Sequence, residues 1–278
     1  MLEQLKYYLS FSFVQYALIV GVLVALCAGL LGVVLVLKRF SYIGDGLSHV
    51  AFGVMAVSMA FHSIDDMLLT IPVTIVVAIL LIKDGEKRKV MGDSALAMIS
   101  VGSLAFGYLI INMSATSSNI AGDVCSALFG ATSILTLSSQ DVTTSIVMSV
   151  IVILTFVIFY NKIFIITFDE TFAKATGINT DKYNLIIAVI TAIVIVIAMN
   201  LVGALLVSAL IIFPAVSSMA VFHQFKQVII CSAVLSVFNS AAGIIVSILF
   251  STPVGATIVV INVATFAFMK GISLVLRR

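Results

Sequence analysis

The chain has 278 residues, of which 62% are hydrophobic and 9% are charged, and its formal net charge is +2. Its mean hydropathy is +1.30, and a soluble domain would carry about 25% charged residues. This composition excludes a soluble globular domain and predicts a protein that crosses a membrane several times.

Nine apolar stretches are long enough to cross a bilayer as helices. The first is too long for the apolar region of a cleaved signal peptide, so we interpret it as a true span. The sixth and seventh share one apolar run that is interrupted only near Asn200, which leaves eight spans as an alternative. The expected spans cover residues 13–37, 43–62, 66–82, 93–113, 142–160, 182–200, 201–221, 228–250 and 254–275.

The positions of the basic residues test this count, because cytoplasmic loops of membrane proteins are enriched in Lys and Arg. With nine spans and the loop at Lys38 and Arg39 inside, only Lys6 of the 14 basic residues falls outside. This distribution predicts an N-terminus outside the cell and a C-terminus in the cytoplasm.

The stretch 121–138 is fairly apolar and contains Gly122, Asp123 and Gly130. A full crossing here would place the basic loop at 162–182 outside, so we expect a re-entrant or interfacial segment. The expected fold class is an all-α integral membrane protein. It is a polytopic bundle of eight or nine transmembrane helices with one re-entrant or interfacial segment.

Asp45 and His49 lie four residues apart, so they share one face of a helix. Ionisable side chains within membrane spans are costly and commonly functional. Carboxylate and imidazole ligate zinc or manganese, so the pair is a candidate metal site. The alternative is a hydrogen-bonded pair that only joins two helices. Two ligands are too few for a closed tetrahedral site, and a second copy of the chain would supply two more.

Three charged or imidazole side chains, His62, Asp65 and Asp66, follow the second expected span in a short outer loop. They would fit either a first contact for an incoming cation or an ordinary solvated loop, and the solvated loop is favoured.

The segment 167–179 predicts a short amphipathic helix on the cytoplasmic side. Thr167 or Asp169 can cap its N-terminus, Glu170 lies in its first turn, and Gly177 is placed to end it. Such a helix would either dock into a groove on a soluble partner or lie on lipid headgroups.

Pro214 lies in a later apolar span, where it removes a backbone hydrogen bond and is expected to bend the helix as a static packing feature. The sequence contains no G-x-x-x-x-G-K-[ST] motif, so the chain has no P-loop for ATP. If transport is driven by ATP, a second chain must supply the ATPase.

Five segments together resemble the permease subunits of ABC importers for zinc, manganese and iron, and the resemblance extends through nearly the whole chain. In the segment 123–130, Ala127 stands where the family usually has an aromatic residue. The sequence of residues 46–53 resembles the zinc branch of the family more than the manganese branch. The motifs are Gly44-Asp45-x-Leu47-Ser48-His49, Asp123-Val124-Cys125-Ser126-Ala127-Leu128-Phe129-Gly130, Asp169-Glu170-x-Phe172-Ala173-x-Ala175-x-Gly177, Gly203-Ala204-Leu205-Leu206-Val207-Ser208-Ala209-Leu210 with Pro214, and Pro253-x-Gly255-Ala256-x-Ile258-Val259.

The resemblance implies one transmembrane permease domain over residues 1–278, in a bacterial plasma membrane and without enzymatic activity of its own. It implies a homodimeric pore, an extracellular or periplasmic metal-binding protein, and a transported metal held by Asp45 and His49. No permanently bound cofactor and no nucleic acid are expected. The expected contacts with a separate ABC ATPase are Asp169, Glu170, Phe172, Ala173 and Gly177.

We therefore expect ATP-driven uptake of a divalent transition metal by alternating access, with Zn²⁺ favoured and Mn²⁺ or Fe²⁺ as alternatives. A secondary transporter or channel that works without ATP is an alternative of a different class. It would need several intramembrane charges, of which only Asp45 is clear, and no inverted repeat is visible. A purely structural membrane protein would leave the Asp45–His49 pair unexplained.

Overall fold

The structure is a computed structural model that describes residues 7–61, 66–87, 92–114 and 137–276. His62 and Asp65 lie outside these ranges, as does nearly all of the expected re-entrant segment at 121–138. For Asp66 the backbone alone is described.

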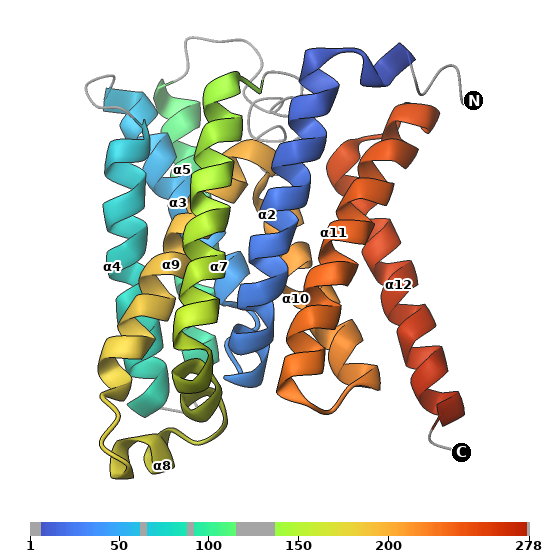
Figure 1. Cartoon of the computed structure of the whole chain (residues 1–278). Helices are drawn as coiled ribbons and strands as arrows, with labels where there is room; N and C mark the ends of the chain where they lie inside the picture. The colour runs from blue at the N-terminus through green and yellow to red at the C-terminus, as the bar shows by residue number, and fades with distance from the viewer. Residues whose placement is uncertain (1–6, 62–65, 88–91, 115–136, 277–278) are drawn as a thin grey trace.

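Nine long helices dominate the described ranges, in which no strand occurs (Figure 1). Seven of them have an apolar stretch of at least 18 residues, and α3 and α4 carry shorter apolar stretches. The expected all-helical, polytopic fold is confirmed. The long helices are α2 (Ser12–Leu37), α3 (Ile43–Phe61), α4 (Asp66–Lys87), α5 (Gly92–Ser114), α7 (Ser139–Phe168), α9 (Thr180–Val202), α10 (Ala204–Val221), α11 (Phe225–Phe250) and α12 (Val254–Leu276).

Capping residues set the two ends of α7, which lie beyond the span expected from hydropathy. The fifth expected span was 142–160, but α7 extends to Phe168, where Asp169 follows in extended conformation. A lysine or asparagine at the membrane surface does not stop a helix, whereas a new cap does. At its other end, Ser138 and Asp141 form a capping box that starts α7.

The break between the sixth and seventh expected spans lies at Gly203. Its φ of 91° is in a region that glycine adopts without strain, and α9 and α10 end and begin on either side of it. The two helices are therefore separate elements, and the break follows the Asn200 position predicted from sequence by three residues.

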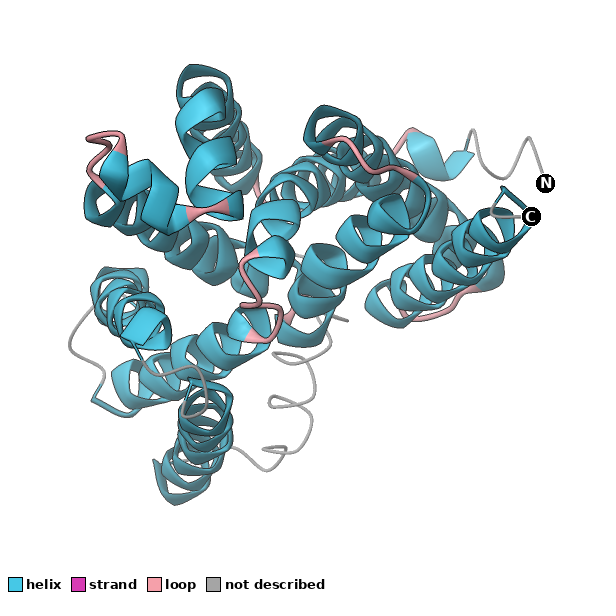
Figure 2. Ribbon diagram, turned by 90° about the horizontal axis from the view of Figure 1, so that it is seen from below, coloured by secondary structure: helices cyan, strands magenta, loops and turns pink. Residues whose placement is uncertain are grey.

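Helix α2 forms the centre of the bundle. It is the most deeply enclosed of the seven apolar helices, and it packs against α7, α9, α10 and α11. Its side chains are apolar all round, as expected for a helix buried in protein. Helices α5 and α12 expose most of their side chains at the periphery. Viewed from the end of the bundle, α-helices make up nearly all of the described chain (Figure 2).

Small residues allow α2 to approach its neighbours closely. The Ser232 hydroxyl of α11 donates to the backbone oxygen of Gly29 at 2.8 Å. A Cβ added at Gly32 would overlap the carbonyl oxygen of Ile211 in α10. The backbones of α2 and α10 thus touch where α10 passes the start of α3.

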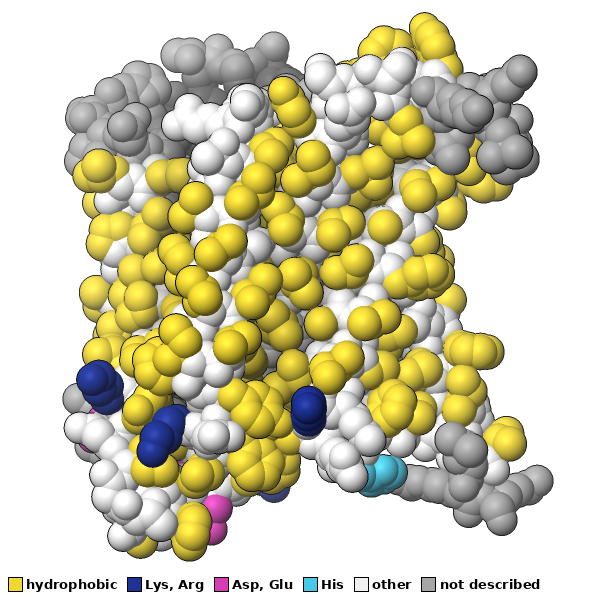
Figure 3. All heavy atoms as spheres, viewed as in Figure 1, with side chains coloured by type: hydrophobic (Ala, Val, Ile, Leu, Met, Phe, Trp, Pro, Cys, Tyr) yellow, Lys and Arg dark blue, Asp and Glu magenta, His cyan; other side chains and the backbone are white. Residues whose placement is uncertain are grey.

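The basic side chains visible in Figure 3 gather near one end of the bundle, below a face that is otherwise apolar. The same end contains the short helix α8 (Glu170–Ala175), the end of α7, the start of α9 and the end of α12 (Figure 1). This arrangement agrees with the one-sided charge distribution of the sequence, and the orientation in the membrane stays a prediction.

Replacing Gly32 by Ala is expected to destabilise the protein by about 1–3 kcal/mol, as over-packing of a dense core does. The added methyl group has to displace α10. Gly271→Ala in α12 is the matched control, because no described atom lies within 4 Å of its Cβ position. Thermal unfolding of both purified variants in detergent tests this, and equal unfolding temperatures would contradict the close contact between α2 and α10.

Candidate metal site

The Asp45–His49 pair lies in the first two turns of helix α3, which starts at Ile43. The backbone N–H of Ile43 donates to the oxygen of Phe40, and that of Gly46 donates to Tyr42, so the preceding turn leads directly into the helix. Asp45 lies in the first turn, where the positive end of the helix dipole stabilises a carboxylate. His49 follows one turn later on the same face.

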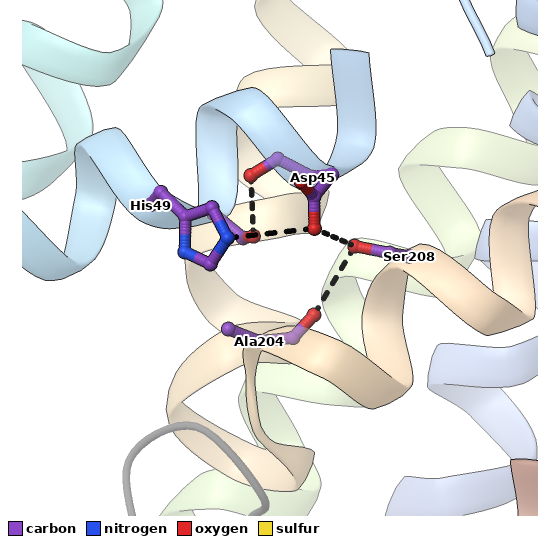
Figure 4. A network of polar contacts seen from close by, with 5 residues as sticks. Asp45, His49, Ala204 and Ser208 are labelled. Atoms are coloured by element: carbon purple, nitrogen blue, oxygen red, sulfur yellow. Dashed lines mark hydrogen bonds and ion pairs between the residues drawn. The ribbon is translucent and has the colours of Figure 1, made fainter. Parts of the chain in front are cut away.

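Asp45 Oδ1 contacts side chains from two helices (Figure 4). It lies 3.5 Å from His49 Nε2 on its own helix. It also lies 3.5 Å from Ser208 Oγ on α10, which donates to it. The structure therefore brings Asp45 and His49 together, as their spacing predicts, and adds a contact from α10.

The two side chains differ in exposure. The His49 side chain is 11% exposed, whereas the Asp45 side chain is 38% exposed. The buried Nδ1 of His49 has no hydrogen-bond partner among the described residues, and an unpaired buried polar atom costs about 1–3 kcal/mol. Both residues belong to α3, so their contact does not join two helices. The pair therefore has unused capacity to bind a ligand or a partner.

The spacing of the pair suits a metal ion. A tetrahedral ion with bonds of about 2.1 Å separates neighbouring ligand atoms by about 3.4 Å. Asp45 Oδ1 and His49 Nε2 are 3.5 Å apart, which fits one edge of such a tetrahedron. In the part of the chain that the structure describes, no three His, Cys, Asp or Glu side chains come together. The described residues thus offer at most half of a closed site.

Ser208 of α10 is a neighbour of the candidate pair that the sequence does not single out. Its hydroxyl has one proton and two acceptors within reach, Asp45 Oδ1 at 3.5 Å and the backbone oxygen of Ala204 at 3.3 Å. The motif from Gly203 to Leu210 marked the segment, but no pattern in the sequence says that α10 crosses α3. Ser208 can hold the Asp45 carboxylate from a second helix.

The expected short helix after α7 is present as α8. The Asp169 carboxylate accepts from the N–H of Phe172 at 2.8 Å and caps the helix. Glu170 pairs with Lys174 at 2.7 Å across one turn. Gly177, with a φ of 82°, ends the helix. These residues lie at one end of the bundle (Figure 1), on a different element from Asp45 and His49.

The faces of α8 are distinct. Ala173 is fully buried against the bundle, whereas the Phe172 side chain is 57% exposed. An exposed phenylalanine on a short, capped and ion-paired helix is typical of a docking contact more than of a core residue.

Comparison with known proteins gives the family. The profile of the ABC 3 transport family matches residues 10–273. The chain belongs to this family. The resemblance to permeases of metal-uptake ABC importers is thereby confirmed, and the chain is a multi-pass membrane protein.

Relatives in the ABC 3 transport family include proteins named for two different metals. The manganese transport system membrane protein MntC of Halalkalibacterium halodurans is 27% identical, over 93% of this chain and 87% of its own length. The high-affinity zinc uptake system membrane protein ZnuB of Buchnera aphidicola is 30% identical, over 86% and 89%. The solved structure of PsaBC from Streptococcus pneumoniae in complex with Fab contains a similar chain. That chain is 26% identical, with a TM-score of 0.85 and complete coverage of both chains.

Four of the five ABC 3 motifs lie at helix starts or form a whole helix. They lie at the start of α3, along α8, at the start of α10 and at the start of α12. The motif at 123–130 lies outside the described residues. The structure thus brings the first and fourth motifs together through Asp45 and Ser208.

Ser208→Ala is expected to weaken divalent-metal binding about tenfold, because partners that orient a ligand typically contribute 10- to 100-fold in affinity. Ser208→Thr keeps the hydroxyl and should retain most of the affinity. Ser218→Ala is the matched control on the same helix, since its hydroxyl donates only to Ala215. Titration of the purified permease with Zn²⁺ and Mn²⁺ measures the effect. Equal affinities for the S208A and S218A variants would remove Ser208 from the site.

Proposed function

We propose that this chain is the transmembrane subunit of an ATP-driven importer that takes up a divalent transition metal, with Asp45 and His49 as ligands along its path. The observation that carries the proposal is the 3.5 Å contact of carboxylate and imidazole on α3 within an apolar helical bundle. Ionisable residues at such positions mark ion pathways.

The site becomes complete in a homodimer. One chain supplies one carboxylate and one imidazole, and four ligands close a tetrahedral site. A two-fold axis beside α3 would bring two copies of Asp45 and His49 together, as symmetric dimers do with residues near their axis. The absence of a third metal-ligating side chain among the described residues supports this stoichiometry.

Zinc is the favoured cargo. Two carboxylates and two imidazoles form a ligand set that zinc accepts in tetrahedral geometry, and the 3.5 Å spacing fits it. The similarity to the zinc protein ZnuB supports the same choice. Manganese is the second candidate, because MntC, a manganese protein, matches 93% of the chain and the same ligands also bind Mn²⁺.

ATP hydrolysis would come from a separate ABC ATPase. Helix α8 projects from the bundle end where basic side chains gather (Figures 1 and 3), which suits a soluble cytoplasmic partner. Asp169, Glu170, Phe172, Ala173 and Gly177 form or shape the docking helix. A metal-binding protein on the opposite, outer side would deliver the ion, and movement of α8 would switch access to Asp45 and His49 from outside to inside.

Asp45→Ala and His49→Ala are each expected to abolish metal uptake, because each removes half of the ligands that one chain supplies. The measurement is uptake of radioactive Zn²⁺ and, separately, Mn²⁺ in cells that express the chain with its ATPase. Asp181→Ala and His223→Ala are matched controls that remove the same side-chain types from the start of α9 and from the turn before α11.

The outcomes of this uptake experiment are separable. Uptake of zinc that vanishes in both variants supports the cation and the site. Uptake of manganese alone keeps the mechanism and replaces the metal. Normal uptake by both variants at normal expression would refute the site, and uptake without a functional ATPase would refute the ABC mechanism.

Phe172→Ala is expected to reduce metal-dependent uptake at least tenfold while metal binding stays unchanged, because truncating a central aromatic contact typically costs about 2 kcal/mol or more. Phe250→Ala is the matched control, since this side chain is 68% exposed at the end of α11 that lies away from α8 (Figure 1). Glu170→Ala should act like Phe172→Ala. Wild-type coupling to ATP hydrolysis in both α8 variants would show that the partner docks elsewhere.

A further inference from the structure

A polar contact links α9, which follows α8 in the chain, to the end of α2. The end of α2 leads directly into α3, which contains Asp45 and His49. The Lys38 ammonium at the end of α2 donates to Asn184 Oδ1 in α9 at 2.5 Å, although the two residues are 146 positions apart in sequence. Asn184 is only 5% exposed. Hydrogen bonds from a charged donor in such surroundings are among the strongest in proteins.

The connection from α8 to Asn184 is short and stiff. The N–H groups of Gly177 and Ile178 donate to carbonyls of α8 and close its end. Asn179 then caps α9 by accepting from the N–H of Lys182 at 3.1 Å. Asn184 lies in the second turn of α9, so it moves with the end of α8 unless a cap breaks.

The connection from Lys38 to Asp45 is equally stiff. Arg39 has a φ of 64°, which is uncommon for a residue with a side chain. The N–H groups of Arg39 and Phe40 donate to Val36 and Leu35, and these two bonds lock the end of α2. The chain enters α3 four residues after Arg39. A displacement of Lys38 is therefore passed to the first turn of α3.

The direct contacts between α3 and α9 are of a different kind from the Lys38–Asn184 hydrogen bond. Ala51 and Phe52 of α3 pack against Val196 and Met199 of α9 in an apolar cluster. Apolar surfaces can slide past each other because the hydrophobic effect is non-directional. The Lys38–Asn184 hydrogen bond fixes direction as well as distance.

We propose that Lys38 and Asn184 are positioning residues that transmit the movement of α8 to the Asp45–His49 pair during transport. This inference rests on the proposed function, because it needs α8 as the docking helix and the pair as the metal site. The hydrogen bond forces the start of α3 to follow α9 when the ATPase displaces α8. Neither residue touches the ion.

The test is transport by the complete transporter, permease with its ATPase, in proteoliposomes. Lys38→Met and Asn184→Leu remove the hydrogen bond with little change in side-chain size. Each is expected to lower the amount of metal taken up per ATP hydrolysed about tenfold, the scale of a hydrogen bond to a charged group. The KM for the metal and its binding affinity should change less than twofold. The loss in the double variant should be smaller than the two single losses combined, because both single variants remove the same Lys38–Asn184 hydrogen bond.

Conservative variants and a control separate this role from a general loss of structure. Asn184→Asp and Lys38→Arg keep an acceptor and a donor and should retain most of the coupling. Lys182→Met removes an exposed lysine from the same helix and should behave as wild type.

Wild-type coupling in Lys38→Met would overturn the inference. A fall in metal affinity that parallels the loss of coupling would also overturn it, because the hydrogen bond would then only stabilise the metal site. Loss of coupling in Asn184→Asp equal to that in Asn184→Leu would also overturn it. Failure of the proposed function itself shows differently, as normal uptake by Asp45→Ala.

Discussion

The crossing of α2, α3 and α10 at Ile211 is the contact on which the arrangement of the site depends. Gly32 of α2 lies against the Ile211 backbone, and a Cβ at Gly44 of α3 would lie 2.9 Å from the Ile211 side chain. A side chain at Gly32 would push the α10 backbone outwards, whereas one at Gly44 would displace the end of the Ile211 side chain. Ser208 is three residues before Ile211 on α10, so this close packing sets the distance between its hydroxyl and Asp45. Small residues here serve the geometry of a polar contact as well as the packing of helices.

A carboxylate and an imidazole inside an apolar bundle need compensation. Asp45 receives part of it from the first turn of α3 and from Ser208. His49 is more deeply buried and keeps one ring nitrogen without a partner among the described residues. This incomplete compensation fits the proposed transport site, because an ion that is bound too completely by its ligands cannot leave.

Helix α8 and the Asp45–His49 pair lie on different elements, so the proposed transport requires a rigid connection between them. Capped helix ends provide this on both sides of the Lys38–Asn184 hydrogen bond. Central α2 is held by neighbours on all sides, whereas α5 and α12 at the periphery have few. In the proposed mechanism, movements of α8 are thus directed into the centre of the bundle, where α2 and α3 join.

Sequence by itself determined the features that depend on neighbouring residues. The lengths of apolar stretches predicted the helical bundle, and the four-residue spacing put Asp45 and His49 on one face. Capping residues predicted α8 with Thr167 or Asp169 at its start, and the structure has Asp169 there. Tertiary structure alone decided which helices touch. Ser208 meets Asp45 across 163 positions and Lys38 meets Asn184 across 146. Such contacts arise from the close packing of whole helices, which local hydropathy and propensity do not encode.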